Sequence, residues 1–164
     1  MSNYFEDLEI GRHLILGTHT FTAADIKAFA RKYDPQPFHL DEEAAKASLM
    51  GALCASGWHT AAQYVGFNIR TRQKWEAEIR ARGEEIAIWG PSPGFKDLKW
   101  PRAVYSGDTV TYSQTIADTV TLRSRPERGL LVQHGEAHNQ NGELVFHVTG
   151  QIMVPRRQPL KVAG

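Results

Sequence analysis

The sequence predicts an α+β fold in which an antiparallel sheet covers one long helix, and three observations indicate it. The stretch from Gly57 to Gly83 begins with an apolar stripe at helical spacing and becomes increasingly charged toward its end. Residues 109–116 alternate apolar and polar side chains, as a half-buried strand does. Asn141-Gly142 lies between two apolar segments, which is the strongest short-range signal of a β-hairpin. One helix packed against several antiparallel strands accounts for all three.

The length and charge of the chain limit its class. At 164 residues it is long enough for one domain, which we place at residues 1–155, followed by a loose C-terminal tail at 156–164. A net charge of +1 provides no general field for nucleic acid or an anionic membrane. No stretch approaches the roughly 20 apolar residues of a membrane span, and the acidic N-terminus lacks the features of a signal peptide. We therefore expect a cytoplasmic protein with no nucleic-acid or membrane partner.

Local signals predict the remaining elements in order. Residues 8–22 mix β-branched and apolar side chains with two glycines, which favours a strand or a pair of strands near a sheet edge. Thr22 is a good N-cap for a helix over 23–33, which must end before Pro35 because proline disfavours the helical conformation in the residue before it. Asp41 can cap a short second helix. That helix is predicted over 42–49, strands over 86–90 and 95–100, and the two arms of the hairpin over 130–137 and 144–154.

Groups suited to proton transfer are concentrated in one short stretch that precedes the long helix. Asp34 and His39 are five residues apart on a segment that Pro35 and Pro37 are expected to keep out of a helix. The long helix begins at Gly57, and the first amide N–H groups of a helix are free to bind an oxygen. An acid, a base and a site for an oxyanion therefore lie within a short length of chain.

This stretch resembles the hydratase motif of the MaoC-like dehydratases, which include the (R)-specific enoyl-CoA hydratases. The resemblance rests on residues 34–41 (DPQPFHLD), the Ala-rich helix after them, a Gly-Ala-Leu connection and Ser-Gly at the head of the long helix. Residues 104–108 (VYSGD) resemble the family's turn into its long strands, and the likeness covers residues 5–154. It implies a hotdog fold for the 1–155 domain, with the sheet wrapped around one central helix.

The resemblance also implies roles for individual residues. Asp34 and His39 match the family's catalytic pair, and Gly57 matches the glycine whose amide binds the thioester oxygen. The implied activity is that of a hydratase or dehydratase acting on the C2–C3 bond of an acyl-CoA thioester, with no metal and no dissociable cofactor. Gln36 stands where asparagine is commoner, and Ser56 stands where many members have histidine. Both are candidate substrate-binding residues.

Simpler interpretations of the same residues stay open. Asp34 can merely end a helix before a proline, and a lone histidine such as His39 is more often part of a core. Ser56 is most simply the N-cap of the long helix. We interpret His59 as structural and Cys54, the single cysteine, as a buried and inert thiol.

A metal site is not predicted. The histidines on the expected hairpin, His134, His138 and His147, lack the tight spacing of metal ligands. Two rivals to the hydratase also stay open. One is a thioesterase on the same fold, which would direct its carboxylate at C1, and the other is a non-catalytic protein that binds acyl thioesters.

The predicted sheet leaves an edge strand unpaired. Such an edge exposes backbone N–H and C=O groups that pair readily with another chain. Joining two edges across a two-fold axis removes this problem, so we expect a homodimer or a dimer of dimers.

Overall fold

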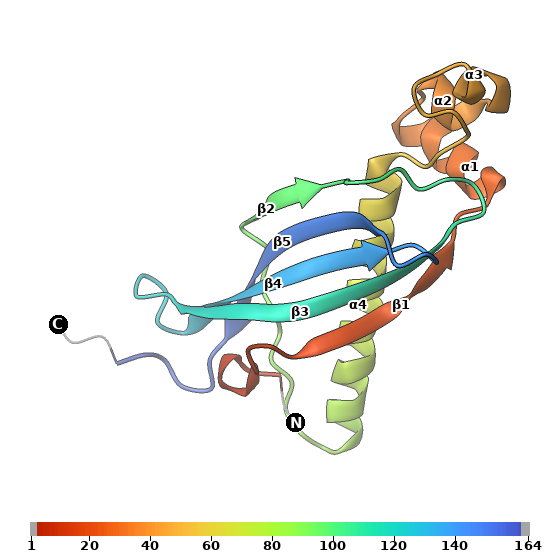
Figure 1. The fold of residues 1–164 in the computed structure, drawn as a ribbon. Coiled ribbons are helices and arrows are strands. Elements are labelled where there is room, and N and C mark those ends of the chain that lie inside the picture. Colours follow the sequence, from red (N-terminus) through yellow and green to blue (C-terminus); the bar gives the residue numbers. More distant parts are fainter. Residues whose placement is uncertain (1–2, 162–164) are drawn as a thin grey trace.

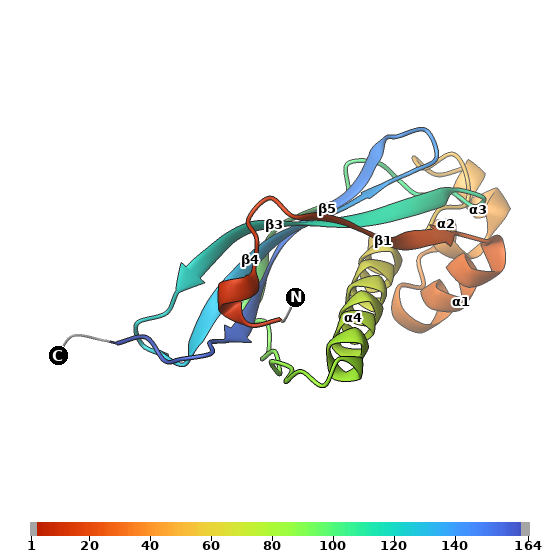
Figure 2. The ribbon, with the colours of Figure 1, turned by 90° about the horizontal axis from the view of Figure 1, so that it is seen from below.

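The computed structural model describes residues 3–161 and shows a five-stranded antiparallel sheet with a long helix against one face (Figures 1 and 2). Every neighbouring pair of strands runs antiparallel, and the order in the sheet is β1-β3-β4-β5-β2. The predicted α+β class and the antiparallel sheet over one helix are therefore confirmed. The strands are β1 (His13–Thr20), β2 (Gly94–Lys99), β3 (Thr109–Thr121), β4 (Arg128–His138) and β5 (Leu144–Pro155).

The helices divide into one long element and a group of short ones. The long helix α4 (Gly57–Ala81) crosses the sheet, while the short helices gather beyond one end of the sheet, beside the start of α4 (Figure 1). No helix within residues 3–161 is both long enough and apolar enough to cross a membrane. The short helices are α1 (Ala23–Tyr33), α2 (Pro37–Leu40) and α3 (Glu42–Lys46), and a 3-10 turn η1 (Phe5–Asp7) precedes β1.

The predicted caps set the helix starts. The Thr22 hydroxyl accepts a hydrogen bond from the Asp25 amide at the start of α1, over 3.1 Å. The Asp41 carboxylate accepts one from the Ala44 amide at the start of α3, over 2.8 Å. Each bond satisfies one of the amides that a helix N-terminus leaves unpaired. The second short helix ends earlier than predicted, at Lys46 instead of residue 49.

The core lies between α4 and the sheet. Val110, Tyr112 and Ile116 are buried on one face of β3, as their alternation predicts. Tyr64 reaches from α4 onto the sheet at Gly135, where a Cβ would lie 2.3 Å from the tyrosine ring. Only glycine fits at this position of β4, because any side chain would displace the buried ring.

Residues 86–90 do not form the predicted strand. The Asn3 side chain takes the place of a neighbouring strand, since its amide donates to the Ala87 carbonyl over 3.0 Å and its oxygen accepts from the Ala87 amide over 2.7 Å. Further on, the Gly90 amide donates to the Met153 carbonyl over 2.7 Å. These single hydrogen bonds pair the backbone N–H and C=O groups of Ala87 and the N–H of Gly90 without the repeated bonds of a strand pair. Residues 86–90 are therefore a connection and not a strand.

The described part of the predicted tail is anchored. The Arg156 guanidinium lies 3.2 Å from Glu6, and the Arg157 guanidinium lies 2.7 Å from Asp7. The Leu160 amide donates to the Pro126 carbonyl over 2.8 Å. Residues 156–160 are therefore held against η1 and the β3–β4 connection, while residues 162–164 of the predicted tail lie outside the described residues.

His59 joins α4 to α1 and β1. Its ring stacks on Phe29 with centroids 4.5 Å apart and meets Phe21 edge-on at 4.9 Å. No described residue makes a hydrogen bond to its Nδ1. Burial, followed by the nearby imidazole of His19, lowers the pKa of His59 to about 4.

We expect acid to destabilise the protein through His59. In the unfolded chain this imidazole takes up a proton near its ordinary pKa of 6.5, whereas in the folded chain it stays neutral down to about 4. Stability therefore falls as the pH drops through this window, by a contribution of about 3 kcal/mol. Urea unfolding at several pH values measures it, and the His59→Phe variant should have a shallower pH dependence.

The exposed His13 provides the matched control. His13→Gln should keep the pH dependence of the wild type. If His59→Phe also keeps it, the imidazole does not titrate as its environment indicates.

Candidate active site

The site is formed where the end of α1, the turn α2 and the start of α4 meet. Asp34 is the residue at which α1 ends, and its amide still donates to the Ala30 carbonyl over 2.9 Å. The next four-residue helix, α2, carries His39, whereas the sequence predicted an irregular segment. The reason is that Pro37 occupies the first helical position, where its missing N–H costs nothing and its fixed φ suits a helix.

Asp34 and His39 face one another. The Asp34 Oδ2 lies 3.5 Å from the His39 Nε2, and only 4% of His39 is exposed. The other ring nitrogen, Nδ1, donates to the Cys54 carbonyl oxygen over 2.7 Å. Because a carbonyl only accepts, this bond assigns the proton of the neutral ring to Nδ1 and leaves Nε2 as an acceptor toward Asp34.

Asp34 is held in its ionised form. Burial raises the pKa of this carboxyl, but hydrogen bonds from the side chains of Ser56 and Gln36 outweigh burial and hold the pKa below its ordinary value, an effect to which the His39 ring adds when it is protonated. The Gln36 amide donates to the Asp34 Oδ1 over 2.9 Å. The two residues that the sequence singled out as candidate substrate ligands thus both contact the acid, and their contact with a substrate stays a prediction.

The first amide of α4 is free. Ser56 is the N-cap of this helix, and its side chain accepts from the Trp58 amide over 3.2 Å. Within residues 3–161, no group accepts a hydrogen bond from the Gly57 amide. An unpaired N–H at the start of a 25-residue helix is a favourable place for a developing negative charge.

Trp100 is a part of the site that the sequence did not predict. A Cβ on Gly57 would lie 2.7 Å from the Trp100 ring, and that ring meets Trp58 edge-on with centroids 5.2 Å apart. Trp100 is 43 residues from Gly57 in the chain, and no local pattern links them. The Cys54 carbonyl that orients His39 was missed for a similar reason, since a backbone acceptor carries no residue signature.

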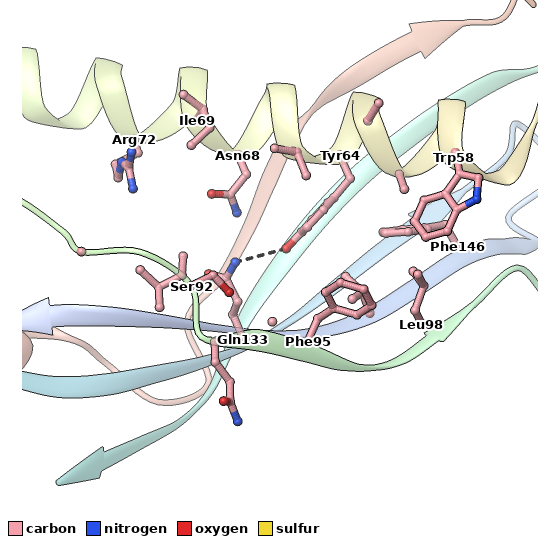
Figure 3. Close-up of a pocket in the computed structure, with 18 residues that line it drawn as sticks. Trp58, Tyr64, Asn68, Ile69, Arg72, Ser92, Phe95, Leu98, Gln133 and Phe146 are labelled. Atoms are coloured by element: carbon pink, nitrogen blue, oxygen red, sulfur yellow. Dashed lines mark hydrogen bonds between the residues drawn. The ribbon is translucent and has the colours of Figure 1, made fainter. Parts of the chain in front are cut away.

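An apolar groove of about 550 Å³ lies along α4 and begins at Trp58, in the first turn of this helix (Figure 3). Trp58 lies at one end and Arg72 at the other, with β2 and β5 forming the opposite wall. The apolar lining comes from α4 (Trp58, Ala61, Ala62, Val65 and Ile69), β2 (Phe95 and Leu98) and β5 (Phe146, Val148 and Ile152).

Two of the hairpin histidines, His134 and His147, lie beside protein side chains. The His134 Nδ1 lies 3.1 Å from the Thr149 hydroxyl, and the His147 Nδ1 lies 3.7 Å from a Glu136 carboxylate oxygen. Between residues 3 and 161, no group of three or more His, Cys, Asp and Glu side chains is placed to hold a metal ion.

The geometry suits the activation of a water molecule. The facing atoms of Asp34 and His39 both accept hydrogen bonds, so a molecule placed between them must donate two, as water does. Its oxygen lone pairs are then free to attack. The unpaired Gly57 amide provides a donor for an oxygen that becomes negative during the reaction.

Comparison with known proteins gives one family. The family model described as "MaoC like domain" matches residues 7–127. A MaoC-like dehydratase from Rhodospirillum rubrum is 36% identical over 94% of this chain and 98% of its own, with a TM-score of 0.77. None of the curated protein sequences gives a significant match.

More distant structures share the fold. The R-hydratase PhaJ1 from Pseudomonas aeruginosa is 20% identical, with a TM-score of 0.64 over 99% of this chain and 93% of its own. The Mycobacterium tuberculosis protein RV0216, described as a double hotdog fold, is 15% identical, with a TM-score of 0.66 over 99% of this chain and 47% of its own. The predicted hotdog fold is therefore confirmed.

We expect Gly57→Ala to destabilise the protein by about 1–3 kcal/mol, because the added methyl group forces the Trp100 ring away from the start of α4. Urea unfolding followed by tryptophan fluorescence measures both the loss in free energy of unfolding and the movement of the Trp100 ring. Adding Trp100→Leu should recover part of the stability.

The matched control lies in the same helix. A Cβ on Gly66 would meet only the flexible end of Arg70, at 3.0 Å, so Gly66→Ala should be neutral or stabilising. If both substitutions change the free energy of unfolding equally, helix propensity determines the change and the Trp100 contact does not.

Proposed function

The chain belongs to the MaoC-like domain family, and we propose that it is a hydratase or dehydratase that acts on the C2–C3 bond of an acyl-CoA thioester. One observation carries the proposal. Asp34 and His39 present two acceptors 3.5 Å apart, beside a helix start whose first amide is unpaired. A MaoC-like dehydratase and an R-hydratase are among the proteins it resembles, which agrees with this chemistry.

In the hydration direction, a water held by Asp34 and His39 loses a proton to this pair as its oxygen forms a bond to C3. The π electrons of the C2–C3 bond move toward C1, and the thioester oxygen becomes an enolate oxygen. The Gly57 amide stabilises that charge, and a donor of this kind is worth about 3–4 kcal/mol in the barrier. Return of a proton from the pair to C2 completes the addition.

The remaining contacts position these groups. The Cys54 carbonyl fixes the His39 tautomer, and the donors on Gln36 and Ser56 keep Asp34 ionised. An oriented base of this kind needs no metal, because the proton leaves the water and returns to carbon through the same two side chains.

We expect the wild type to consume a short trans-2-enoyl-CoA without releasing thiol. Asp34→Asn and His39→Ala should each lower kcat/KM by about 10²–10⁴-fold, because each removes one of the two proton acceptors. The loss of enoyl absorbance and the appearance of free thiol, followed in one sample, measure both reactions.

Asp41→Asn is the control, since Asn also caps a helix and Asp41 lies outside the pair. Its activity should stay near that of the wild type. Thiol release by the wild type would identify a thioesterase instead. Thermal stabilisation by acyl-CoA with no turnover would identify a binding protein.

A second copy of the chain fits the β2 side of the molecule. No strand within residues 3–161 pairs with the outer edge of β2, and apolar side chains are exposed beside it. Among them Val65 on α4 is 57% exposed and Phe95 on β2 is 61% exposed. We propose that the protein forms a homodimer, or a dimer of dimers, through this edge and the neighbouring face of α4, because a two-fold contact covers both.

We expect light scattering of the purified protein to give twice the 18.4 kDa of the chain, or a higher even multiple. Val65→Asp should shift the mass toward one chain, because a carboxylate in an apolar contact is costly to bury. Val120→Asp, at a comparably exposed position of β3, should leave the mass unchanged. A wild type of 18.4 kDa would exclude the assembly.

A further inference from the structure

Trp100 places a second unpaired N–H group beside the free amide of Gly57. The position that a Cβ on Gly57 would occupy lies 3.0 Å from the Trp100 indole nitrogen, Nε1. Within residues 3–161 no group accepts a hydrogen bond from this N–H, whereas the Trp89 indole donates to the Asn3 carbonyl over 2.8 Å. The Trp100 side chain is partly exposed, so its ring lies where a substrate can meet it.

The two donors lie on the same side of Gly57. In a helix the Cα–Cβ bond tilts toward the N-terminus, and the N–H groups of the first turn point the same way. The indole takes the place of a Cβ, so it lies on the side to which the Gly57 N–H points. A backbone nitrogen and its own Cβ are about 2.5 Å apart, which puts Nε1 within about 5.5 Å of the Gly57 nitrogen. One oxygen can accept from two donors up to about 5.8 Å apart, at about 2.9 Å from each.

The Trp100 ring is held in this place by its neighbours. It directly follows Lys99, the last residue of β2, which is paired to β5. The Trp58 ring meets it edge-on with centroids 5.2 Å apart. Further along the chain, the Val104 carbonyl accepts from the Ala55 amide over 2.7 Å, which ties the segment after Trp100 to the connection before α4. A donor held in place beforehand needs no reorganisation when charge develops on the substrate.

Donors and acceptors occupy different parts of the site. Asp34 and His39 present acceptors, which suit the protons of water. Gly57 and Trp100 present donors, which suit the oxygen of a thioester. An indole nitrogen donates and does not accept. Trp100 can therefore stabilise a negative oxygen but cannot take a proton from water.

We infer that the Trp100 indole N–H is the second donor of the oxyanion site and binds the thioester oxygen together with the Gly57 amide. The inference rests on the proposed function for the placement of that oxygen at Gly57. It also gives the glycine a second role, because a side chain at position 57 would push the indole away from the oxygen.

The test replaces Trp100 with 3-benzothienylalanine, which keeps the shape of the double ring and has sulfur in place of the N–H. With trans-2-butenoyl-CoA as substrate, kcat should fall about 10²-fold, because one oxyanion donor is lost. KM should change by less than about threefold, because the bond strengthens mainly as the oxygen becomes negative. Trp100→Phe, which also lacks the N–H, should lose at least as much of kcat.

The same replacement at Trp75 is the matched control. Trp75 is 18 residues beyond Gly57 on α4, which places it roughly 27 Å along the helix. Its replacement should leave kcat and KM near the wild-type values. A wild-type kcat in the Trp100 variant, or an equal loss at the two positions, would overturn the inference.

A second measurement separates this inference from the proposed function. Acetoacetyl-CoA ionises to an enolate that absorbs in the ultraviolet, and an oxyanion site favours the enolate of the bound molecule. Its ionisation constant should be about tenfold larger when it is bound to the wild type than to the benzothienylalanine variant at position 100. If the wild type does not hydrate the enoyl substrate, the hydratase proposal fails, and this comparison alone then decides the role of Trp100. Equal ionisation in the two proteins would refute that role.

Discussion

The candidate site depends on the hydrogen bond that His39 Nδ1 donates to the Cys54 carbonyl oxygen over 2.7 Å. This bond joins the turn α2 to the buried connection before α4, which is itself fixed from the other side by the Ala55 amide bound to the Val104 carbonyl. A buried carbonyl without a donor would be costly, so the connection and the ring stabilise each other. Because the proton is held on Nδ1, the nitrogen that faces Asp34 is an acceptor. The tautomer and the position of the imidazole thus follow from one contact.

The acid of the pair is kept ionised by its neighbours and not by exposure to water. Burial acts against the charge of Asp34, and the donors on Ser56 and Gln36 outweigh it. Gln36 and Ser56 are the two positions at which the chain departs from the commoner residues of the motif it resembles. Each retains a hydrogen-bond donor directed at the carboxylate. Both residues therefore support the ionised form of the acid in this chain.

Local chemistry explains what could be predicted from the sequence, and distance along the chain explains what could not. The caps at Thr22 and Asp41 depend on residues within three positions, and the hairpin at Asn141-Gly142 depends on a turn whose glycine has φ +77°. The strand predicted over 86–90 failed because the backbone of Ala87, at its centre, bonds to the Asn3 side chain, more than 80 residues away. The Trp100 contact with Gly57 has the same character. Each part of the site contributed by a remote segment had no local pattern to predict it.

The groove and the outer edge of the sheet share one strand, β2, so the shape of the groove depends on how that edge is covered. In the described part of the chain β2 pairs with β5 alone, and this pairing is interrupted between Lys96 and Lys99, where Asp97 takes a left-handed φ of +52°. This irregularity changes the course of the strand beside Leu98, which lines the groove. A strand fixed on one side only is easily displaced, so the width of the groove is weakly determined in a single chain. A second copy paired along the free edge would hold β2 from both sides, and the shape of the groove would then be set by the dimer.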